Sequence, residues 1–145
     1  MLQISKATGY SLRAVLALVR SNKNNEVSTV TEIADSEEIP EAFLRKLLRP
    51  LINAGVVETR RGFSGGIRLA KSPGDITVLE VIEAVEGKLG LNECVNEPTI
   101  CEFVEDCPMH EVWMETTERV RNQLNTYDMS LLHKRELENR SRETA

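Results

Sequence analysis

The sequence of 145 residues lacks the long apolar segments that membrane and secreted proteins carry. No apolar run approaches the roughly 18 to 20 residues needed to cross a bilayer. An apolar stretch lies near the N-terminus, but Arg13 and Arg20 interrupt it, and the residue order of a signal peptide is missing. We therefore expect a cytoplasmic protein with no membrane partner, built as one domain or as a small domain with an extension.

The chain also lacks the residue patterns on which most enzymes depend. It has no glycine-rich nucleotide loop, no paired carboxylate site and no nucleophile–base pattern, and His133, one of its two histidines, stands in a polar segment. We therefore expect no enzymatic activity, either from a reactive cysteine or from a bound cofactor.

Cysteine is scarce, and all of it lies in one segment, the cysteine loop: CVNEPTICEFVEDCPMH, residues 94–110. Cys94, Cys101 and Cys107 are followed by His110, and three thiolates with an imidazole suit a structural zinc ion or an iron–sulfur cluster. Tight zinc sites more often pair ligands as Cys-x2-Cys, whereas the gaps of six and five residues found here suit a larger group. Reduced surface thiols without a ligand are the remaining interpretation.

Positive charge is scarce overall but unevenly placed. The formal net charge is −5, yet residues 1–72 carry +4 and residues 73–145 carry −9. The basic half therefore has the charge pattern that phosphate contact requires, in spite of the acidic total.

The basic half has the signals of three helices. The first starts after Ser5, and Ser28 or Thr29 can cap the second. Pro40 opens the third, and Gly55 ends it. Apolar residues at helical spacing fill one face of each, which predicts a packed three-helix unit.

Two short strands, VVETR and GIRLA, follow around the turn RGFSGG. Three helices before a basic hairpin predict a winged helix-turn-helix, whose third helix enters the major groove of DNA. The window 41–71 holds seven basic residues and two acidic ones. An ordinary solvated surface is the alternative, but the arginines recur on both the helix and the hairpin.

The acidic half predicts a short helix over ITVLEVIEAVEG and a long helix from Pro108. The apolar stripe of the long helix consists of Val112, Trp113, Thr116, Val120 and Leu124. The partner helix of a dimer is the usual cover for such a stripe, and packing on its own domain is the alternative. The expected fold is mainly α with a small β-wing, and a long C-terminal helix forms the dimer.

We expect three parts in the chain. Residues 1–75 would form the DNA-binding domain. Residues 76–132 would hold the linker helix, the cysteine loop and the dimerisation helix, and residues 133–145 would form a flexible tail with few apolar residues.

Over residues 5–132 the chain resembles the Rrf family of bacterial winged-helix regulators. The likeness rests on FLRKLLRPLINAGVVETRRGFSGGIRLA, on ITVLEVIEAVEG, and on the cysteine loop with the adjoining HEVW. The resemblance implies a homodimeric regulator, expected to be a repressor, that binds palindromic promoter DNA. It also implies an iron–sulfur cluster whose loss or modification alters DNA binding, in response to cluster status, redox state or nitric oxide.

The resemblance further implies a ligand set. Cys94, Cys101 and Cys107 match the family's cluster cysteines, and His110 matches the histidine that completes a [2Fe–2S] cluster in IscR-like members. NsrR-like members hold a [4Fe–4S] cluster with an aspartate from the partner subunit, where this chain has Gly9. A [2Fe–2S] cluster is therefore favoured, although the first gap is one residue longer than the commonest IscR spacing. The alternatives are an NsrR-like [4Fe–4S] nitric oxide sensor and a zinc-stapled DNA-binding protein without a sensing role.

On the DNA side, the resemblance assigns the recognition positions to Ala42, Phe43 and Arg45 and a wing contact to Arg61. The full set of expected DNA contacts is Phe43, Arg45, Lys46, Arg49, Arg61 and Ser64. IscR has an acidic base reader where this chain has Arg45, so we expect a different operator with a preference for guanine.

Overall fold

The computed structural model describes residues 3–21, 26–63 and 65–145. Its helices and strands are, in order, α1 (Lys6–Ser21), α2 (Val30–Glu37), α3 (Glu41–Asn53), β1 (Val57–Arg60), β2 (Gly66–Leu69), α4 (Val78–Glu86), α5 (Glu93–Asn96), α6 (Pro108–Asn125) and α7 (Met129–Glu143). Short 3₁₀ turns accompany them: η2 (Pro73–Asp75), η3 (Pro98–Ile100) and η4 (Val104–Asp106). The expected class, mainly helical with a two-stranded wing, is confirmed.

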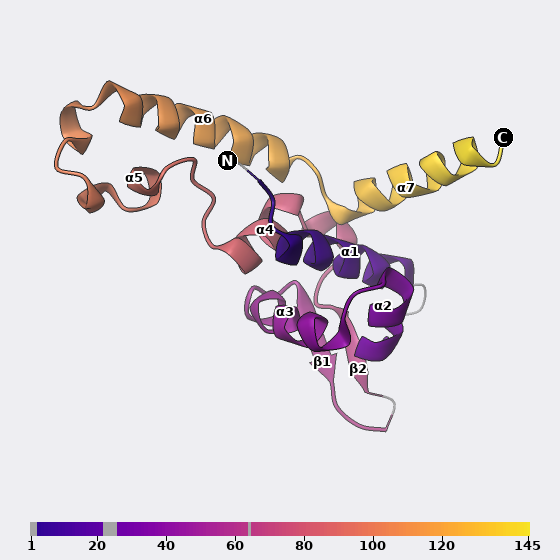
Figure 1. Cartoon of the computed structure of the whole chain (residues 1–145). Helices are drawn as coiled ribbons and strands as arrows, with labels where there is room; N and C mark the ends of the chain where they lie inside the picture. The colour runs from indigo at the N-terminus through magenta and orange to yellow at the C-terminus, as the bar shows by residue number, and fades with distance from the viewer. Residues whose placement is uncertain (1–2, 22–25, 64) are drawn as a thin grey trace.

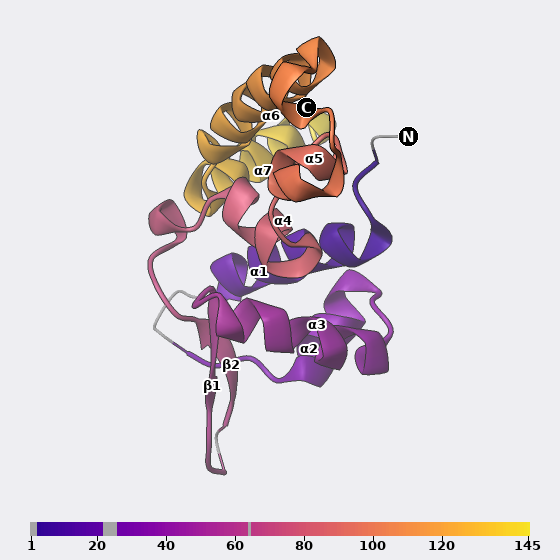
Figure 2. The ribbon, with the colours of Figure 1, turned by 90° about the vertical axis from the view of Figure 1, so that its left-hand side faces the viewer.

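The elements form two ends that are connected through α1 and α4 (Figure 1). At one end lie α2, α3 and the wing, which consists of β1, β2 and their connection and projects away from the helices. At the other end lie the cysteine loop and α6, and Figure 2 shows the same separation from the side. No described helix is long and apolar enough to cross a membrane.

Side chains cap the first helices where the sequence predicts it. Ser5 Oγ accepts a hydrogen bond from the backbone N–H of Thr8 at 3.1 Å, so α1 begins after Ser5. Thr29 caps α2 in a capping box with Glu32, in which each side chain accepts from the other residue's backbone N–H. These caps fix where α1 and α2 start.

The wing is an antiparallel pair in which Val57 lies opposite Leu69. Ser28, the residue before the cap of α2, pairs with β2. Ser28 and Ile67 exchange backbone hydrogen bonds of 2.9 and 2.8 Å. A Cβ atom on Gly66 would lie 2.5 Å from the backbone oxygen of Ser28, so only glycine permits this approach. The wing is therefore anchored at its base to the segment that leads into α2.

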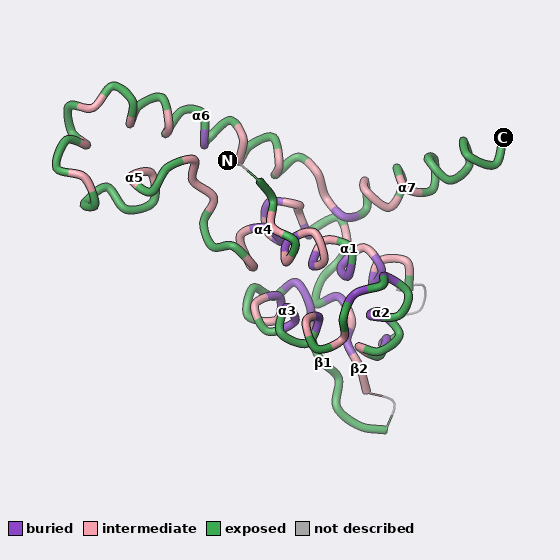
Figure 3. Tube along the Cα trace, in the orientation of Figure 1, coloured by how far each residue is buried: buried purple, intermediate pink, exposed green. Residues whose placement is uncertain are grey.

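One hydrophobic core lies between α1, α2, α3, α4 and the base of the wing (Figure 3). The largest fully buried apolar side chains are Leu44, Leu51, Ile67, Ile76, Met129, Val15, Val56, Val57 and Val81. Each such side chain stabilises the fold by about 1.5–3 kcal/mol relative to leaving it in water. Exposed residues dominate α6 and α7 in Figure 3, so these helices add little to the core of a single chain.

Glu86, at the C-terminal end of α4, holds the start of α1. Its Oε1 accepts the hydroxyl groups of Ser5 and of the fully buried Thr8. These hydrogen bonds, that of Ser5 first, lower the pKa of the Glu86 carboxyl. The charged form of Glu86 therefore stabilises the contact between α4 and α1.

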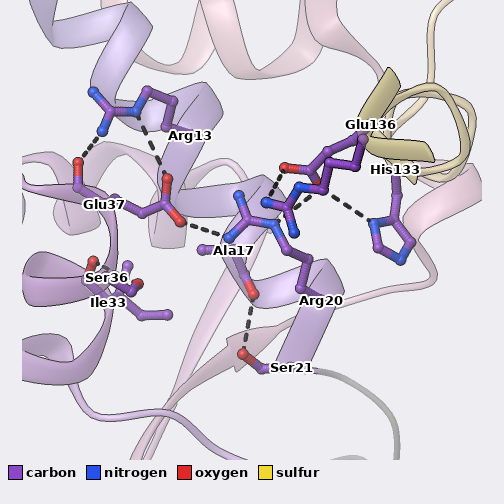
Figure 4. A network of polar contacts seen from close by, with 10 residues as sticks. Arg13, Ala17, Arg20, Ser21, Ile33, Ser36, Glu37, His133 and Glu136 are labelled. Carbon is purple, nitrogen blue, oxygen red and sulfur yellow. Dashed lines mark hydrogen bonds and ion pairs between the residues drawn. The ribbon is translucent and has the colours of Figure 1, made fainter. Parts of the chain in front are cut away.

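An ion-pair network connects α7 to α1 and α2 (Figure 4). Arg20 of α1 binds Glu37 of α2 at 2.6 Å and Glu136 of α7 at 3.0 Å. Arg13 donates to the backbone carbonyl of the same Glu37 and lies 3.7 Å from its carboxylate. The hydrogen bond with Glu37, together with that of Glu136, raises the pKa of Arg20 in spite of partial burial. Two arginines thus compensate the buried carboxylate of Glu37.

The C-terminal segment differs from the flexible tail expected over residues 133–145, because α7 is helical over Met129–Glu143. Asp128 caps its first turn, Met129 is fully buried, and Glu136 binds α1. A single buried side chain and an ion pair anchor this helix to the rest of the chain. The segment therefore has few apolar residues, and its apolar pattern does not predict a helix. The proposed boundaries between the three parts of the chain stay predictions.

Replacing Glu86 by alanine tests the contact between α4 and α1. Because its folded-state pKa is lowered, Glu86 stabilises the fold above its ordinary pKa of 4.5, and this contribution is lost as the pH falls through the folded-state value. Glu86→Ala should lower the free energy of unfolding by about 1 kcal/mol at pH 7, since the site is exposed. Urea unfolding at a series of pH values should show this difference shrinking below pH 4.5.

Glu138→Ala is the matched control, because Glu138 is an exposed glutamate of α7 whose carboxylate takes part in none of the hydrogen bonds found among the described residues. It should show no pH-dependent difference from the wild type. A Glu86→Ala difference that stays constant down to about pH 3 would contradict the assignment of the stabilisation to the charged carboxylate.

Candidate functional site

Exposed cations of α3 and of the wing gather around one groove. We call Arg45, Lys46 and Arg49 of α3, with Arg60 and Arg61 of the wing, the basic face; all five are exposed. The groove between the helix and the wing is lined by Val30, Arg45, Leu48, Arg49, Ile52, Asn53, Thr59, Arg60, Gly66 and Ile67. Apolar side chains thus form part of its lining, and three arginines bring positive charge to it.

Carboxylates neutralise part of the positive charge at this end. Arg45 pairs with Glu41 one turn earlier on α3, and Arg68 of β2 pairs with Glu58 of β1 at 2.5 Å. Among the ion pairs of the described residues, none involves the other four cations of the basic face. These four are therefore available to an anionic partner.

The other residues predicted to contact DNA lie in different environments. Phe43 is half-buried, and its ring meets the ring of Tyr10 on α1 edge-on, with centroids 5.7 Å apart. Phe43 therefore packs α3 against α1, and a direct DNA contact by its ring stays a prediction. Ala42 is exposed beside it, and Ser64 lies outside the described residues.

Phe63 lies between β1 and β2 and was not among the residues predicted to contact DNA. Its side chain is fully exposed, directly after Arg61 and Gly62. The signal was present in the sequence, as an aromatic residue in an otherwise small and polar turn. The wing therefore carries an exposed apolar ring two residues after Arg61, and proteins that bind the minor groove use both apolar and cationic side chains.

The cysteine loop carries the four predicted metal ligands on different segments. Cys94 lies on α5, Cys101 directly follows η3, and Cys107 directly precedes α6, whose first turn holds His110. Nδ1 of His110 lies 3.3 Å from Sγ of Cys94. Within the described ranges, no three side chains of His, Cys, Asp or Glu gather closely enough to hold a metal ion. The fold thus brings together two of the four predicted ligands.

Contacts between α4 and α6 frame the approach to Cys94. Thr117, the one buried residue of α6, accepts the backbone N–H of Leu91 at 3.1 Å. Glu83 of α4 binds Arg121 of α6 and accepts the backbone N–H of Leu89 at 2.9 Å. The segment before the cysteine loop is therefore held at two points.

The side chain of Asn96 also shapes this region. Asn96, at the end of α5, donates to the backbone carbonyl of Lys88 at 2.7 Å. A Cβ atom on Gly90 would lie 2.7 Å from the same amide nitrogen. The hydrogen bond from Asn96 therefore ties α5, and with it Cys94, to the chain that leads to it, and the Asn96 side chain lies close against Gly90.

The donor set of the loop fits an iron–sulfur cluster. All three thiols are free and half-buried, and an imidazole nitrogen already stands beside one of them. The chain between Cys94 and Cys107 consists mainly of 3₁₀ turns and irregular segments, so Cys101 and Cys107 can approach Cys94 without unfolding a core helix. Soft thiolates with one imidazole also suit zinc, so the donor chemistry alone allows both.

Large apolar side chains stand in water on α6 and in the loop before it. Those at least 45% exposed are Ile100, Phe103, Met109, Val112 and Met114. Met109 and Val112 lie three residues apart, which places them on one side of α6. A single chain leaves this side of α6 uncovered.

The comparison with known families covers both ends of the molecule. Residues 4–135 match the model of Rrf2, described as an iron-dependent transcriptional regulator. The chain belongs to the Rrf2 family. This confirms the resemblance found in the sequence, and it makes the chain a transcriptional regulator rather than an enzyme.

Individual relatives of this Rrf2 protein agree with the assignment. The HTH-type transcriptional regulator NsrR of Bacillus licheniformis is 35% identical over 129 residues, which cover 88% of this chain and 90% of the relative. The solved structure of CymR (YrzC), the global cysteine regulator of B. subtilis, has a TM-score of 0.73 at 27% identity and covers 92% of this chain and 98% of its own. IscR of T. potens has a TM-score of 0.70 at 25% identity, with coverages of 93% and 88%. The winged helix-turn-helix and the DNA-binding class are thereby confirmed.

Replacing Thr117 by valine tests the frame of the cysteine loop. The change keeps the shape of the side chain but removes the acceptor of a part-buried backbone N–H, so it should lower the free energy of unfolding by about 1–2 kcal/mol. Hydrogen exchange at Leu91 should become faster. Thr116→Val, at the exposed neighbouring position, is the control and should change neither quantity. Equal effects of the two substitutions would contradict the role of this hydrogen bond.

Proposed function

We propose that this Rrf2 protein is a homodimeric repressor of the cytoplasm whose promoter binding is controlled by an iron–sulfur cluster in the cysteine loop. The observation that carries the proposal is the contact of His110 with Cys94, in a loop that holds every cysteine of the chain. Membership of a family described as iron-dependent supports it. The signal is cluster status, redox state or nitric oxide.

Each ligand has a defined role in this proposal. Cys94, Cys101 and Cys107 would supply thiolates, and His110 would supply a neutral imidazole nitrogen. When bound, the cluster supplies a centre that can change its redox state or react with nitric oxide. Cys107 directly precedes α6 and His110 lies in its first turn, where the His110 backbone N–H donates to the Cys107 carbonyl at 3.1 Å.

The ligand set favours a [2Fe–2S] cluster. Gly9 has no side chain that could reach a partner's cluster, whereas the ring of His110 already lies beside a thiol. The likeness to NsrR of Bacillus licheniformis supports the alternative, a [4Fe–4S] cluster that senses nitric oxide. Counting the irons per chain separates the two.

The dimer would form through α6. Its exposed residues Met109 and Val112 are apolar and lie on one side, and burying them against a partner helix removes this surface from water. A two-fold dimer would present two basic faces, which matches a palindromic operator.

On each half-site, α3 would enter the major groove and the wing would reach the adjacent backbone or minor groove. Arg45 is the expected base reader. Lys46 and Arg49 are the expected phosphate contacts on α3, and Arg61 is that of the wing. Ser64 and Phe43 complete the proposed contacts.

The cluster is tested on protein purified without air. The wild type should be brown and hold two irons and two sulfides per chain, as a [2Fe–2S] cluster requires. Cys101→Ala and Cys107→Ala should abolish loading, because water replaces a thiolate poorly. His110→Ala should leave a labile cluster, and His110→Cys should keep a cluster of lower reduction potential, since an extra thiolate disfavours the added electron.

His133→Ala is the matched control for the imidazole, because His133 lies on α7, outside the cysteine loop. It should bind the cluster with the same iron content and the same absorption spectrum as the wild type. A colourless protein with one zinc ion would replace the proposal with the zinc-stapled alternative. Four irons per chain, or an unchanged spectrum in His110→Ala, would move the assignment to a [4Fe–4S] cluster with a different fourth ligand.

The wing contact is tested by Arg61→Ala. If Arg61 binds the DNA backbone, the affinities for operator and for random DNA should fall by the same factor. The plot of log K against log salt should become less steep by about 1. If it enters the minor groove, selectivity at one A·T-rich step should fall instead. Lys134→Ala, which removes an exposed cation of α7, is the control and should leave DNA binding unchanged. Binding by Arg61→Ala that equals the wild type on both DNAs would contradict the proposed orientation of the wing.

A further inference from the structure

Glu41 is an acidic side chain beside the basic face, and it contacts both helices of the helix-turn-helix. Its Oε1 accepts hydrogen bonds from Nε and Nη2 of Arg45, at 3.0 and 2.5 Å. Its Oε2 accepts the hydroxyl of Thr31 on α2, at 3.1 Å. Glu41 therefore ties the guanidinium of Arg45 to α2 as well as to α3.

Both hydrogen bonds favour the charged form of Glu41. The bond from Arg45 and then the bond from Thr31 lower the pKa of the Glu41 carboxyl. Glu41 is therefore an anion at neutral pH, beside the surface that is proposed to meet phosphates.

The geometry leaves one edge of Arg45 free. A guanidinium has five N–H donors in one plane, and Glu41 uses one from Nε and one from Nη2. The outer edge, formed by Nη1 and Nη2, keeps its donors, and the Arg45 side chain is 58% exposed. Two parallel donors on one edge match O6 and N7 of guanine in the major groove.

We propose that Glu41 is a positioning residue that holds Arg45 for a guanine and keeps it from the phosphate backbone. The inference rests on the proposed DNA contacts of α3 and names the residue that makes one of them selective. Arg45 would read the base, and Glu41 would act through it.

The reason lies in the competition between two kinds of anionic partner. An unrestrained arginine can swing to a phosphate, and phosphate contacts bind every sequence alike. The Glu41 carboxylate already binds Nε and Nη2 of Arg45, so it offsets the attraction of Arg45 to phosphates. Its negative charge also repels phosphates near Arg45. Glu41 would thus lower the affinity for random DNA and increase the difference in affinity between the operator and other sequences.

An ordinary role for Glu41 makes a different prediction. A carboxylate in the first turn of a helix interacts favourably with the helix dipole, and Glu41 is the first residue of α3. Loss of that interaction alone would lower stability without changing preference at any one base pair. Base preference is therefore the readout that separates positioning from helix stabilisation.

The experiment uses the full chain, purified without air, and an operator selected by the wild type from a random duplex library. The guanine read by Arg45 is the one whose preference disappears in Arg45→Ala. Binding is then measured for the operator, for the operator with that G·C pair changed to A·T, and for random DNA, over a range of salt concentrations.

Glu41→Ala should bind random DNA about fivefold more tightly at 0.1 M salt, with a salt slope steeper by about 1, because Arg45 gains a phosphate. The wild-type penalty for the changed base pair should be about 5- to 100-fold, and it should fall by at least about fivefold in Glu41→Ala. Thr31→Val removes the second anchor of Glu41 without changing any charge. It should reduce the same penalty and leave the salt slope unchanged.

Asp35→Ala removes an exposed carboxylate from α2 that takes part in none of the ion pairs found in the described part of the chain, so it measures the effect of net charge alone. It should tighten random binding slightly and keep the full base-pair penalty. If Glu41→Ala and Thr31→Val both fold and keep that penalty, the inference is wrong while the proposed regulator stands. If the wild type selects no sequence at all, or Arg45→Ala loses no preference, the proposed DNA contacts themselves are wrong.

Discussion

The packing of α1 is the constraint on which the other elements depend. This helix contacts α2, α3 and β2 toward the wing, and α4 and α7 toward the other end. Its residues Ala14, Val15 and Leu18 are almost fully buried. Because protein interiors are close-packed, a shift of α1 would disturb contacts on both sides at once. The basic face and the cysteine loop are therefore held in one frame although they lie at opposite ends (Figure 1).

Polar contacts complete a continuous path between these two ends. Thr117 and Arg121 attach α6 to the segment around α4, and Glu86 attaches α4 to the start of α1. The ring of Tyr10 on α1 then meets the ring of Phe43 on α3. Such a path transmits a signal when one of its elements has two arrangements. The junction at Glu86 depends on hydrogen bonds at the ends of two helices rather than on core packing.

The helices of the basic half and the wing could be read from the sequence because each has a local signal. Caps such as Thr29, apolar periodicity and the glycine-rich turn act over a few residues, and the winged fold follows from their order. The helix Met129–Glu143 has one local signal of this kind, the cap at Asp128, but few apolar residues follow it. Its anchors are a buried methionine and the pair of Arg20 with Glu136, which are far apart in the chain. The same applies to Phe43, whose side chain packs on a residue of another helix.

The candidate site likewise has features that follow from local sequence and features that depend on the fold. Cys107 and His110 lie three residues apart at the start of a helix, so their proximity is local, whereas the contact of His110 with Cys94 depends on how the loop folds back. Composition could therefore predict the ligand types, and only the fold could say which two side chains meet. In the same way the pair of Glu41 with Arg45 has a local signal, the spacing of four residues on one helix, whereas the contact of Glu41 with Thr31 of α2 depends on the fold.

The division of charge limits how the cysteine loop can act on DNA. Salt screens exposed charges beyond about 10 Å, and the loop stands at the end of the molecule opposite the wing (Figure 2). A change in the charge of the proposed cluster would therefore have little direct effect on phosphates at the basic face. In the proposed dimer, however, α6 would set the separation of the two recognition helices, and half-sites about 34 Å apart require a matching separation. In the proposed regulator, the loop would therefore act on DNA binding through the geometry of α6 rather than through its charge.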